Sequence, residues 1–287
     1  MVYAVIDIGS NTIRLNLYEY GNNELKTIIS VKKMVGLASY IENGVLSEKG
    51  ITVACSALNE FKSIINHFDV KECYVVATAS LRNIRNTDEA VNAIFTNTGF
   101  TAGVISGGEE ALFNYSGATK FLNIRDGVIV DIGGGSTEVV TFERRKILSA
   151  HSMPIGSLNL YKKCVSCILP NSDERILILK NVLDEVDSLV VDSIKPYDTI
   201  IGIGGTIRAV LKINNSIYNL PDDNKEIKIE NLEEIIRILE ANDKNSLRLI
   251  LQTVPDRVHT IIPGIIILKT MTKVFKIKKI VVSDYGM

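Results

Sequence analysis

The sequence predicts an α/β protein, and three observations carry that prediction. The chain has 287 residues, of which 46% are hydrophobic, so it can form one large domain or two of ordinary size with real cores. Candidate strands alternate with candidate helices, a pattern typical of mixed or parallel sheets covered by helices. The stretches "YAVIDIGSNTIRLNLYEY" (3–20) and "GVIVDIGGGSTEVVTFER" (127–144) also align with each other, which indicates a duplicated unit.

Each copy of the duplicated stretch predicts a β-hairpin. An apolar strand ends at an Asp and a glycine turn, and a second strand with period-two alternation follows, as in Ile13, Leu15 and Leu17 or in Val139 and Thr141. We therefore expect two domains, 1–124 and 125–287. Ligands of open α/β sheets gather outside the strand ends, so the active site is expected in a cleft between the domains.

The other elements follow from hydrophobic periodicity and from turn and cap residues. Between the hairpins, strands are predicted within 26–37, 72–80 and 100–106, and helices within 47–68, 86–99 and 107–122. After the second hairpin, helices are predicted near 154–168, 172–193, 230–240, 245–251 and 264–274, with a further helix from Thr206 and strands at 198–204 and 277–286.

Composition and charge exclude several classes of function. The formal net charge is −1, so the chain as a whole is no basic nucleic-acid binder. Met1 leads directly into a strand-like segment, with no signal peptide. The most apolar late stretch, 260–271, is interrupted by Pro263 and Lys269 and is too short for a span of about 20 residues. We expect a soluble, cytoplasmic protein without a membrane segment.

The four cysteines point to no special chemistry. Cys164 and Cys167 form a lone CxxC, in a stretch that reads as helical. A zinc site would need a second close pair or histidines at ligand spacing. Ordinary reduced cytosolic cysteines are the expected state.

Three glycine turns predict phosphate binding. A glycine turn at a strand end exposes successive backbone N–H groups, which bind phosphate oxygens, although any single turn is also an ordinary hairpin device. Asp7 and Asp131 precede two of the turns in the same register, as expected for carboxylates that hold Mg²⁺ beside phosphate. The candidate phosphate-binding residues are Gly9, Ser10, Asn11, Gly133, Gly134, Gly135, Ser136, Thr137, Gly204, Gly205 and Thr206.

Acidic and basic residues complete the candidate site. Ser106 and Glu109 have the spacing of a capping box, which leaves Glu110 as a candidate general base for water or as a favourable charge at a helix N-terminus. Arg82 follows a strand end, where its side chain can clamp a phosphate, with Arg85 as an alternate. Either arginine can instead belong to a solvated helix face, which is the preferred explanation for Arg85.

Glu138 follows the second glycine turn. It can join Asp131 on a metal or simply face solvent on the hairpin.

These residues together resemble the exopolyphosphatase/guanosine pentaphosphatase (Ppx/GppA) family of the actin, Hsp70 and sugar-kinase superfamily. The matching stretches span the chain: "AVIDIGSNTIRL" (4–15), "VATASLRN" (76–83), "VISGGEEALFNYSGA" (104–118), "VIVDIGGGSTEVV" (128–140), "GIGGTIRAV" (202–210), "PGIIIL" (263–268) and "VSDYG" (282–286).

The resemblance implies two actin-like (ribonuclease H-like) domains and Mg²⁺-dependent hydrolysis of terminal phosphoanhydrides. The implied substrates are inorganic polyphosphate and guanosine pentaphosphate. By motif position, Glu110 matches the catalytic base and Arg82 a phosphate-contacting arginine, while Asp131 and Glu138 match acidic residues at the metal and the attacking water. Asp7 and the glycine turns match phosphate loops. A further need for a monovalent cation such as K⁺, and a homodimer, are left open.

The chain departs from the family pattern in two places. Gly36 stands where an arginine is common, with Lys32 and Lys33 as substitutes. The sequence stops at "DYGM", whereas long members continue into a helical region resembling HD-type domains. A short two-domain member or a truncated form is therefore expected, with less processive cleavage of long polyphosphate.

Two other functions compete with this hypothesis. One is an ATPase or kinase of the same superfamily, which would turn over ATP. The other is a sensor that binds guanosine tetra- or pentaphosphate without releasing phosphate.

Overall fold

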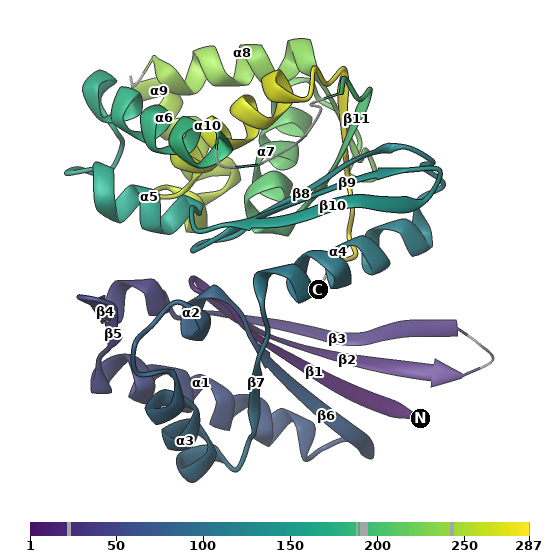
Figure 1. The fold of residues 1–287 in the computed structure, drawn as a ribbon, viewed down its shortest axis with the longest axis vertical. Helices are drawn as coiled ribbons and strands as arrows, with labels where there is room; N and C mark the ends of the chain where they lie inside the picture. Colours follow the sequence, from purple (N-terminus) through teal and green to yellow (C-terminus); the bar gives the residue numbers. More distant parts are fainter. Residues whose placement is uncertain (22–23, 188, 190–194, 242–243, 287) are drawn as a thin grey trace. The chain divides into compact units, whose positions relative to one another are not determined.

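The computed structural model describes residues 1–21, 24–187, 189, 195–241 and 244–286. The chain divides into two compact units, Met1–Ser106 and Gly107–Met287, each with its own sheet and helices (Figure 1).

The first unit is a five-stranded sheet in the order β3-β2-β1-β6-β7. β1 and β2 form the predicted antiparallel hairpin, and β6 and β7 join it in parallel. The elements are β1 (Val2–Ile8), β2 (Thr12–Gly21), β3 (Glu24–Met34), η1 (Leu37–Tyr40), β4 (Ile41–Glu42), β5 (Val45–Leu46), α1 (Glu48–Ile65), β6 (Val70–Ala77), α2 (Ala79–Arg82), α3 (Thr87–Thr98) and β7 (Ala102–Val104).

Local sequence explains the two long helices of this unit. Ser47 caps α1 by accepting a hydrogen bond from the N–H of Gly50, and α3 ends at Gly99 in the left-handed conformation that glycine adopts easily. The apolar faces of both helices pack with alternate residues of β1 and β2 in one core, in which Phe61 is fully buried.

The second unit is a six-stranded sheet in the order β10-β9-β8-β11-β13-β12. Its elements are α4 (Gly107–Phe121), β8 (Gly127–Ile132), β9 (Thr137–Glu143), β10 (Lys146–Met153), α5 (Ser157–Cys164), α6 (Ser172–Asp187), β11 (Thr199–Ile203), α7 (Gly204–Ile217), β12 (Glu226–Lys228), α8 (Ile229–Glu240), α9 (Lys244–Thr253), η2 (Pro255–Arg257), α10 (Ile261–Val274) and β13 (Lys279–Val282).

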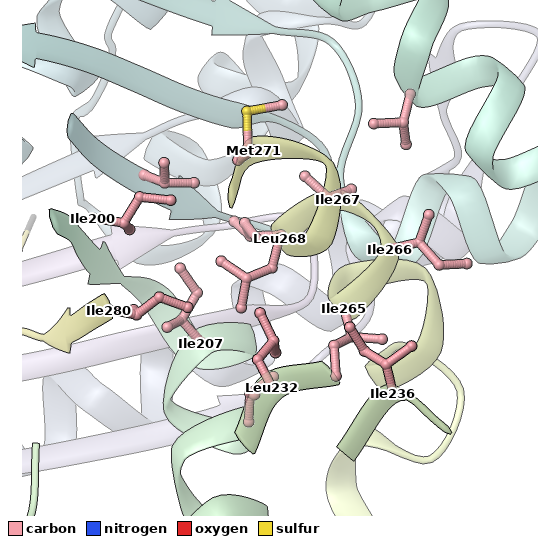
Figure 2. Close-up of a cluster of buried hydrophobic side chains, with 14 of the residues drawn as sticks. Ile200, Ile207, Leu232, Ile236, Ile265, Ile266, Ile267, Leu268, Met271 and Ile280 are labelled. Carbon is pink, nitrogen blue, oxygen red and sulfur yellow. The ribbon is translucent and has the colours of Figure 1, made fainter. Parts of the chain in front are cut away.

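One face of this sheet carries the largest core of the protein. Helix α10 is the apolar stretch noted in the sequence, and its isoleucines and Leu268 lie buried among side chains of α7, α8, β11 and β13 (Figure 2). Pro263 and Gly264 lie in its first turn. Among the described residues, no helix combines the length and the apolar character needed to cross a bilayer.

The opposite face of the same sheet is covered by α4. Ala111 and Ala118 of the helix pack on Ile129, Val140 and Phe142, whose strand neighbours Val128 and Val139 face the larger core instead. Strand β9 is therefore buried on both faces, rather than alternating as its sequence suggested. This packing also places α4 with the second unit, so the units divide between residues 106 and 107, whereas a boundary between 124 and 125 was predicted.

Several elements differ from the sequence prediction. β10 was not predicted, because its first half lies at the sheet edge with Ile147 and Leu148 exposed, and no alternation marks it. α5 ends at Cys164, so Cys167 lies outside the helix. α7 begins at Gly204 instead of Thr206, which makes the third glycine turn part of the helix. Residues 188 and 190–193 of the predicted helix 172–193 lie outside the described residues.

Candidate functional site

The first glycine turn joins β1 to β2 at the end where Asp7 lies. The N–H of Gly9 donates to the carbonyl of Thr12 at 3.0 Å and closes the turn. The carbonyls of Ser10 and Asn11 accept hydrogen bonds from the backbone of residues 35–38. In a trans peptide the C=O and the next N–H point in opposite directions, so the N–H groups of Asn11 and Thr12 point away from that segment.

The second glycine turn has the same closing bond. The N–H of Gly133 donates to the carbonyl of Ser136 at 3.0 Å, as Gly9 does to Thr12. The two hairpins are thus alike in backbone geometry as well as in sequence. The turn lies directly against Gly156, where a Cβ would come within 2.4 Å of the Gly134 carbonyl carbon, so only glycine fits at that position.

Residues at the start of α5 donate hydrogen bonds to the carbonyl oxygens of the second glycine turn. Three consecutive carbonyls accept hydrogen bonds: Gly133 from the N–H of Ser157 (2.9 Å), Gly134 from the N–H of Leu158 (3.0 Å) and Gly135 from Nδ2 of Asn159 (3.0 Å). By peptide planarity, the N–H groups of Gly134, Gly135 and Ser136 point to the side away from α5. Successive N–H groups on one side form an anion-binding nest.

The third glycine turn is the first turn of α7, and two charged side chains lie against it. Gly204 has φ +85°, and a Cβ there would lie 2.2 Å from Oδ1 of Asp131. A Cβ on Gly205 would lie 2.2 Å from Nη2 of Arg257. Both glycines are therefore required by close approach, and the N-terminus of α7 contacts a carboxylate and a buried guanidinium.

Arg257 was missed in the sequence because nothing local marks it. It lies in the short helix η2 and only the tertiary fold brings it to Gly205. The hydroxyls of Thr137 and Thr206 are buried and make contacts inside the second unit. Oγ1 of Thr137 donates to the carbonyl of Ile155 at 2.7 Å, and Oγ1 of Thr206 lies 3.4 Å from Oγ of Ser157.

Three carboxylates lie near one another beside the turn of the β8–β9 hairpin in the second unit. Asp131 and Glu138 are a cross-strand pair, and Glu110 of α4 is close enough for its charge to act on Glu138. Glu110 is 8% exposed and Glu138 only 1% exposed. Oγ of Ser152 donates to Oε1 of Glu138 at 2.7 Å.

The buried position of Glu138 changes its acidity. Burial is the largest cause that raises the pKa of Glu138 well above its usual value, and the negative charges of Glu110 and Asp131 add to it. Hydrogen bonds from Ser152 and Ser136 act in the opposite direction. Such concentrated negative charge inside a fold is costly and is typical of a functional site.

This donor set fits a divalent cation that keeps other ligands. Among the residues that the structure describes, no group of three or more His, Cys, Asp or Glu side chains is arranged to hold a metal ion by itself. Mg²⁺ is usually bound by one or two carboxylates together with phosphate oxygens and water, which matches the pair Asp131 and Glu138. A cation there would also offset the repulsion that raises the pKa of Glu138.

The first unit holds the other predicted residues. Asp7 lies opposite Val76 of β6 and Arg14 of β2, near the ends of those strands. α2 starts at the same edge, because the N–H of Thr78 and Oγ of Ser80 both donate to the carbonyl of Ile8. The edge therefore brings together Asp7, the first glycine turn and the helix that carries Arg82.

The arginines and lysines of the first unit have local contacts. Nη1 of the half-buried Arg82 donates to the carbonyl of Ile105 at 3.2 Å, which orients the side chain beside β7. Arg85 is exposed and its side chain lies against Gly44. Gly36 has φ +58°, a conformation that an arginine would adopt only with strain, and Lys33 forms an ion pair with Glu60.

Comparison with known proteins gives a consistent result. The model of the Ppx/GppA phosphatase family matches residues 17–287. A putative exopolyphosphatase from Haemophilus influenzae is 28% identical over 98% of this chain and 87% of its own length. A guanosine-5'-triphosphate,3'-diphosphate pyrophosphatase from Aliivibrio fischeri is 31% identical over 74% of this chain, which spans only 43% of that relative.

The solved structures agree with the fold. The crystal structure of the Aquifex aeolicus member of the Ppx/GppA protein family has a TM-score of 0.80 and 26% identity, over 100% of this chain and 94% of that chain. This likeness confirms the predicted fold class, an α/β protein of two actin-like bodies.

Proposed function

Because the chain belongs to the Ppx/GppA phosphatase family, we propose that it is a hydrolase that releases orthophosphate from the terminal phosphoanhydride of inorganic polyphosphate. Guanosine pentaphosphate is the second proposed substrate. The observation that carries the proposal is the group of buried Glu110, buried Glu138 and half-buried Asp131 beside two glycine turns of the second unit. A chain of phosphates needs both of these features, donors for its oxygens and carboxylates that handle a cation and a water.

The phosphate contacts come from backbone and from arginine. The N–H groups of Gly134, Gly135 and Ser136 form the nest that receives phosphoryl oxygens. The first glycine turn, with Asn11 and Thr12, is assigned the same task in the first unit. Arg82 supplies positive charge to the phosphate chain, as a guanidinium does when it pairs with phosphate oxygens.

The acidic residues divide the remaining work. Glu110 orients the attacking water and takes its proton for in-line attack on the terminal phosphorus. Asp131 and Glu138 would hold Mg²⁺, and Asp7 is proposed as a metal-holding carboxylate of the first unit. When bound, Mg²⁺ neutralises negative charge that develops on the phosphoryl oxygens. Most of the rate enhancement then comes from positioning and electrostatic stabilisation, as is usual for phosphoryl transfer.

The test of this proposal is phosphate release from short polyphosphate, long polyphosphate, guanosine pentaphosphate and ATP, each with and without Mg²⁺. We expect Mg²⁺-dependent release from polyphosphate or guanosine pentaphosphate and little from ATP. Turnover of ATP alone would favour an ATPase or kinase, and tight binding of guanosine nucleotide without release would favour a sensor.

The role of Glu110 has a matched control in the preceding residue. Glu110→Gln should lower kcat about 10²- to 10⁴-fold, the range expected for loss of a general base. Glu109→Gln makes the same chemical change on the exposed side of α4 and should keep wild-type kcat. Equal rates in Glu110→Gln and wild type, with both folded, would show that Glu110 is not the base.

A further inference from the structure

Helix α4 buries the wrong residues for an ordinary amphipathic helix. Glu110 and Asn114, four positions apart and therefore on one face, are buried, and Asn114 has no exposed surface at all. Leu112 and Phe113 of the same helix are 45% and 50% exposed. Burying a carboxylate and an amide costs free energy that burying two apolar side chains would not cost. The buried polar face of α4 is therefore expected to have a function.

The amide of Asn114 contacts one of the three carboxylates. Its Nδ2 donates to Oδ2 of Asp131 at 2.9 Å. The other oxygen of that carboxylate, Oδ1, lies against Gly204 at the start of α7. The two oxygens of Asp131 are thus in different surroundings, and the hydrogen bond selects one rotation of the carboxylate.

The opposite side of Asn114 is held by the segment that follows β13. A Cβ on Gly286 would lie 3.2 Å from Oδ1 of Asn114, and a Cβ on Gly117 would lie 3.3 Å from the Cα of Gly286. Two glycines therefore let the chain after β13 approach α4 closely at Gly286. This backing keeps the Nδ2 side of the amide turned toward Asp131.

We infer that Asn114 is a positioning residue, which fixes the Asp131 carboxylate and couples it to the helix that carries Glu110. The inference rests on the proposed function, because Asp131 is assigned to the cation and Glu110 to the water. Through one helix and one hydrogen bond, the base and a metal-holding carboxylate keep a constant separation. A donor behind a metal-binding carboxylate is the kind of outer partner whose loss weakens metal affinity about 10- to 100-fold.

The second unit offers a matched control for a merely structural asparagine. Asn214 of α7 is also completely buried, but its Nδ2 donates to Oδ1 of Asn215 and its Oδ1 accepts from Nδ2 of Asn231. Its partners are amides rather than carboxylates. Asn114→Leu and Asn214→Leu therefore make the same chemical change, at similar burial, with and without a carboxylate partner.

The experiment compares these two variants with the wild-type chain. Mn²⁺ binding is measured by titration calorimetry without substrate, and kcat and KM for short polyphosphate are measured over a range of Mg²⁺. We expect Asn114→Leu to bind Mn²⁺ at least tenfold more weakly and to lose kcat with little change in KM at saturating Mg²⁺. Asn214→Leu should lose stability while keeping Mn²⁺ affinity within twofold of wild type.

Each of the other outcomes contradicts either this inference or the proposed function. Unchanged Mn²⁺ affinity in Asn114→Leu, or equal losses in both variants, would overturn the inference, as would a wild-type chain that binds no Mn²⁺. Wild-type binding of Mn²⁺ without phosphate release would instead overturn the proposed function. Should Asn114→Leu not fold, Asn114→Ser provides the same comparison, because a serine hydroxyl ends short of Asp131.

Discussion

Replacing Glu138 by Gln should make the metal-free protein more stable at neutral pH, although it removes a proposed functional group. Glu138 is 1% exposed, and burial together with the charges of Glu110 and Asp131 raises its pKa. Glutamine has the same shape, carries no charge, and can still accept the hydrogen bond from Ser152. The substitution therefore removes an unfavourable charge without leaving a cavity.

The pH dependence follows from the sign of the pKa shift. The pKa of Glu138 is higher in the folded protein than in the unfolded chain, so folding is linked to proton uptake. The stability due to this group is fully present below the unfolded pKa of about 4.3 and is lost as pH rises through the folded pKa. For one proton the loss is about 1.4 kcal/mol per pH unit between the two values. The advantage of Glu138→Gln should therefore be small at the acid end and grow with pH.

The measurement is urea unfolding in EDTA at several values between pH 5 and 8, followed by far-UV circular dichroism because the chain has no Trp. The two compact units can unfold separately, so the comparison uses the transition that the substitution moves. Glu143→Gln on the same strand, where Glu143 pairs with Lys195, is the control and should keep the wild-type pH slope. Parallel pH curves for wild type and Glu138→Gln, or a variant less stable throughout, would refute the reasoning.

Three further predictions concern other parts of the two units. Gly204→Ala should destabilise the protein by at least about 1–3 kcal/mol in urea unfolding and weaken Mg²⁺ activation, because its φ is +85° and its Cβ would overlap Asp131; wild-type values would contradict the assigned contact. Arg82→Ala should lower kcat/KM for polyphosphate about 10- to 100-fold, whereas Arg85→Ala, on an exposed side chain, should leave it unchanged, and similar values in the two variants would remove Arg82 from the site. Phe142→Ala should lower the free energy of unfolding by about 3–5 kcal/mol, because it leaves a cavity under α4. An unchanged unfolding transition in calorimetry would contradict that packing.

Local patterns in the sequence were enough to predict the two hairpins. The Asp and glycine turn shared by both copies, followed in the first by the alternation of Ile13, Leu15 and Leu17, reflect backbone geometry within a few residues. The helices with clear caps, α1 and α3, were predicted for the same reason. The sequence could not separate a turn before α7 from the first turn of α7, because both use glycine.

The parts that were missed depend on tertiary packing. Arg257 and Asn114 reach the site only because η2 and α4 pack on the second sheet, and neither residue belongs to a local motif. The packing of α4 on the second sheet also depends on tertiary contacts. Its buried alanines could pack on either sheet, and only their contacts with Ile129 and Phe142 show which one. The roles assigned to Glu110, Arg82 and Asp131 stay predictions.

The close approach of Gly286 to α4 also makes one part of the second unit depend on the last of the described residues to be synthesised. The core of the first unit uses only residues up to 106, so it can close while translation continues. The second unit needs β13 between β11 and β12, and Gly286 against Asn114 and Gly117, before its sheet and the surroundings of α4 are finished. The three carboxylates lie early in the second unit, but Asn114 gains its neighbour Gly286 only when nearly the whole described chain has been made, so the surroundings of Asp131 are completed last.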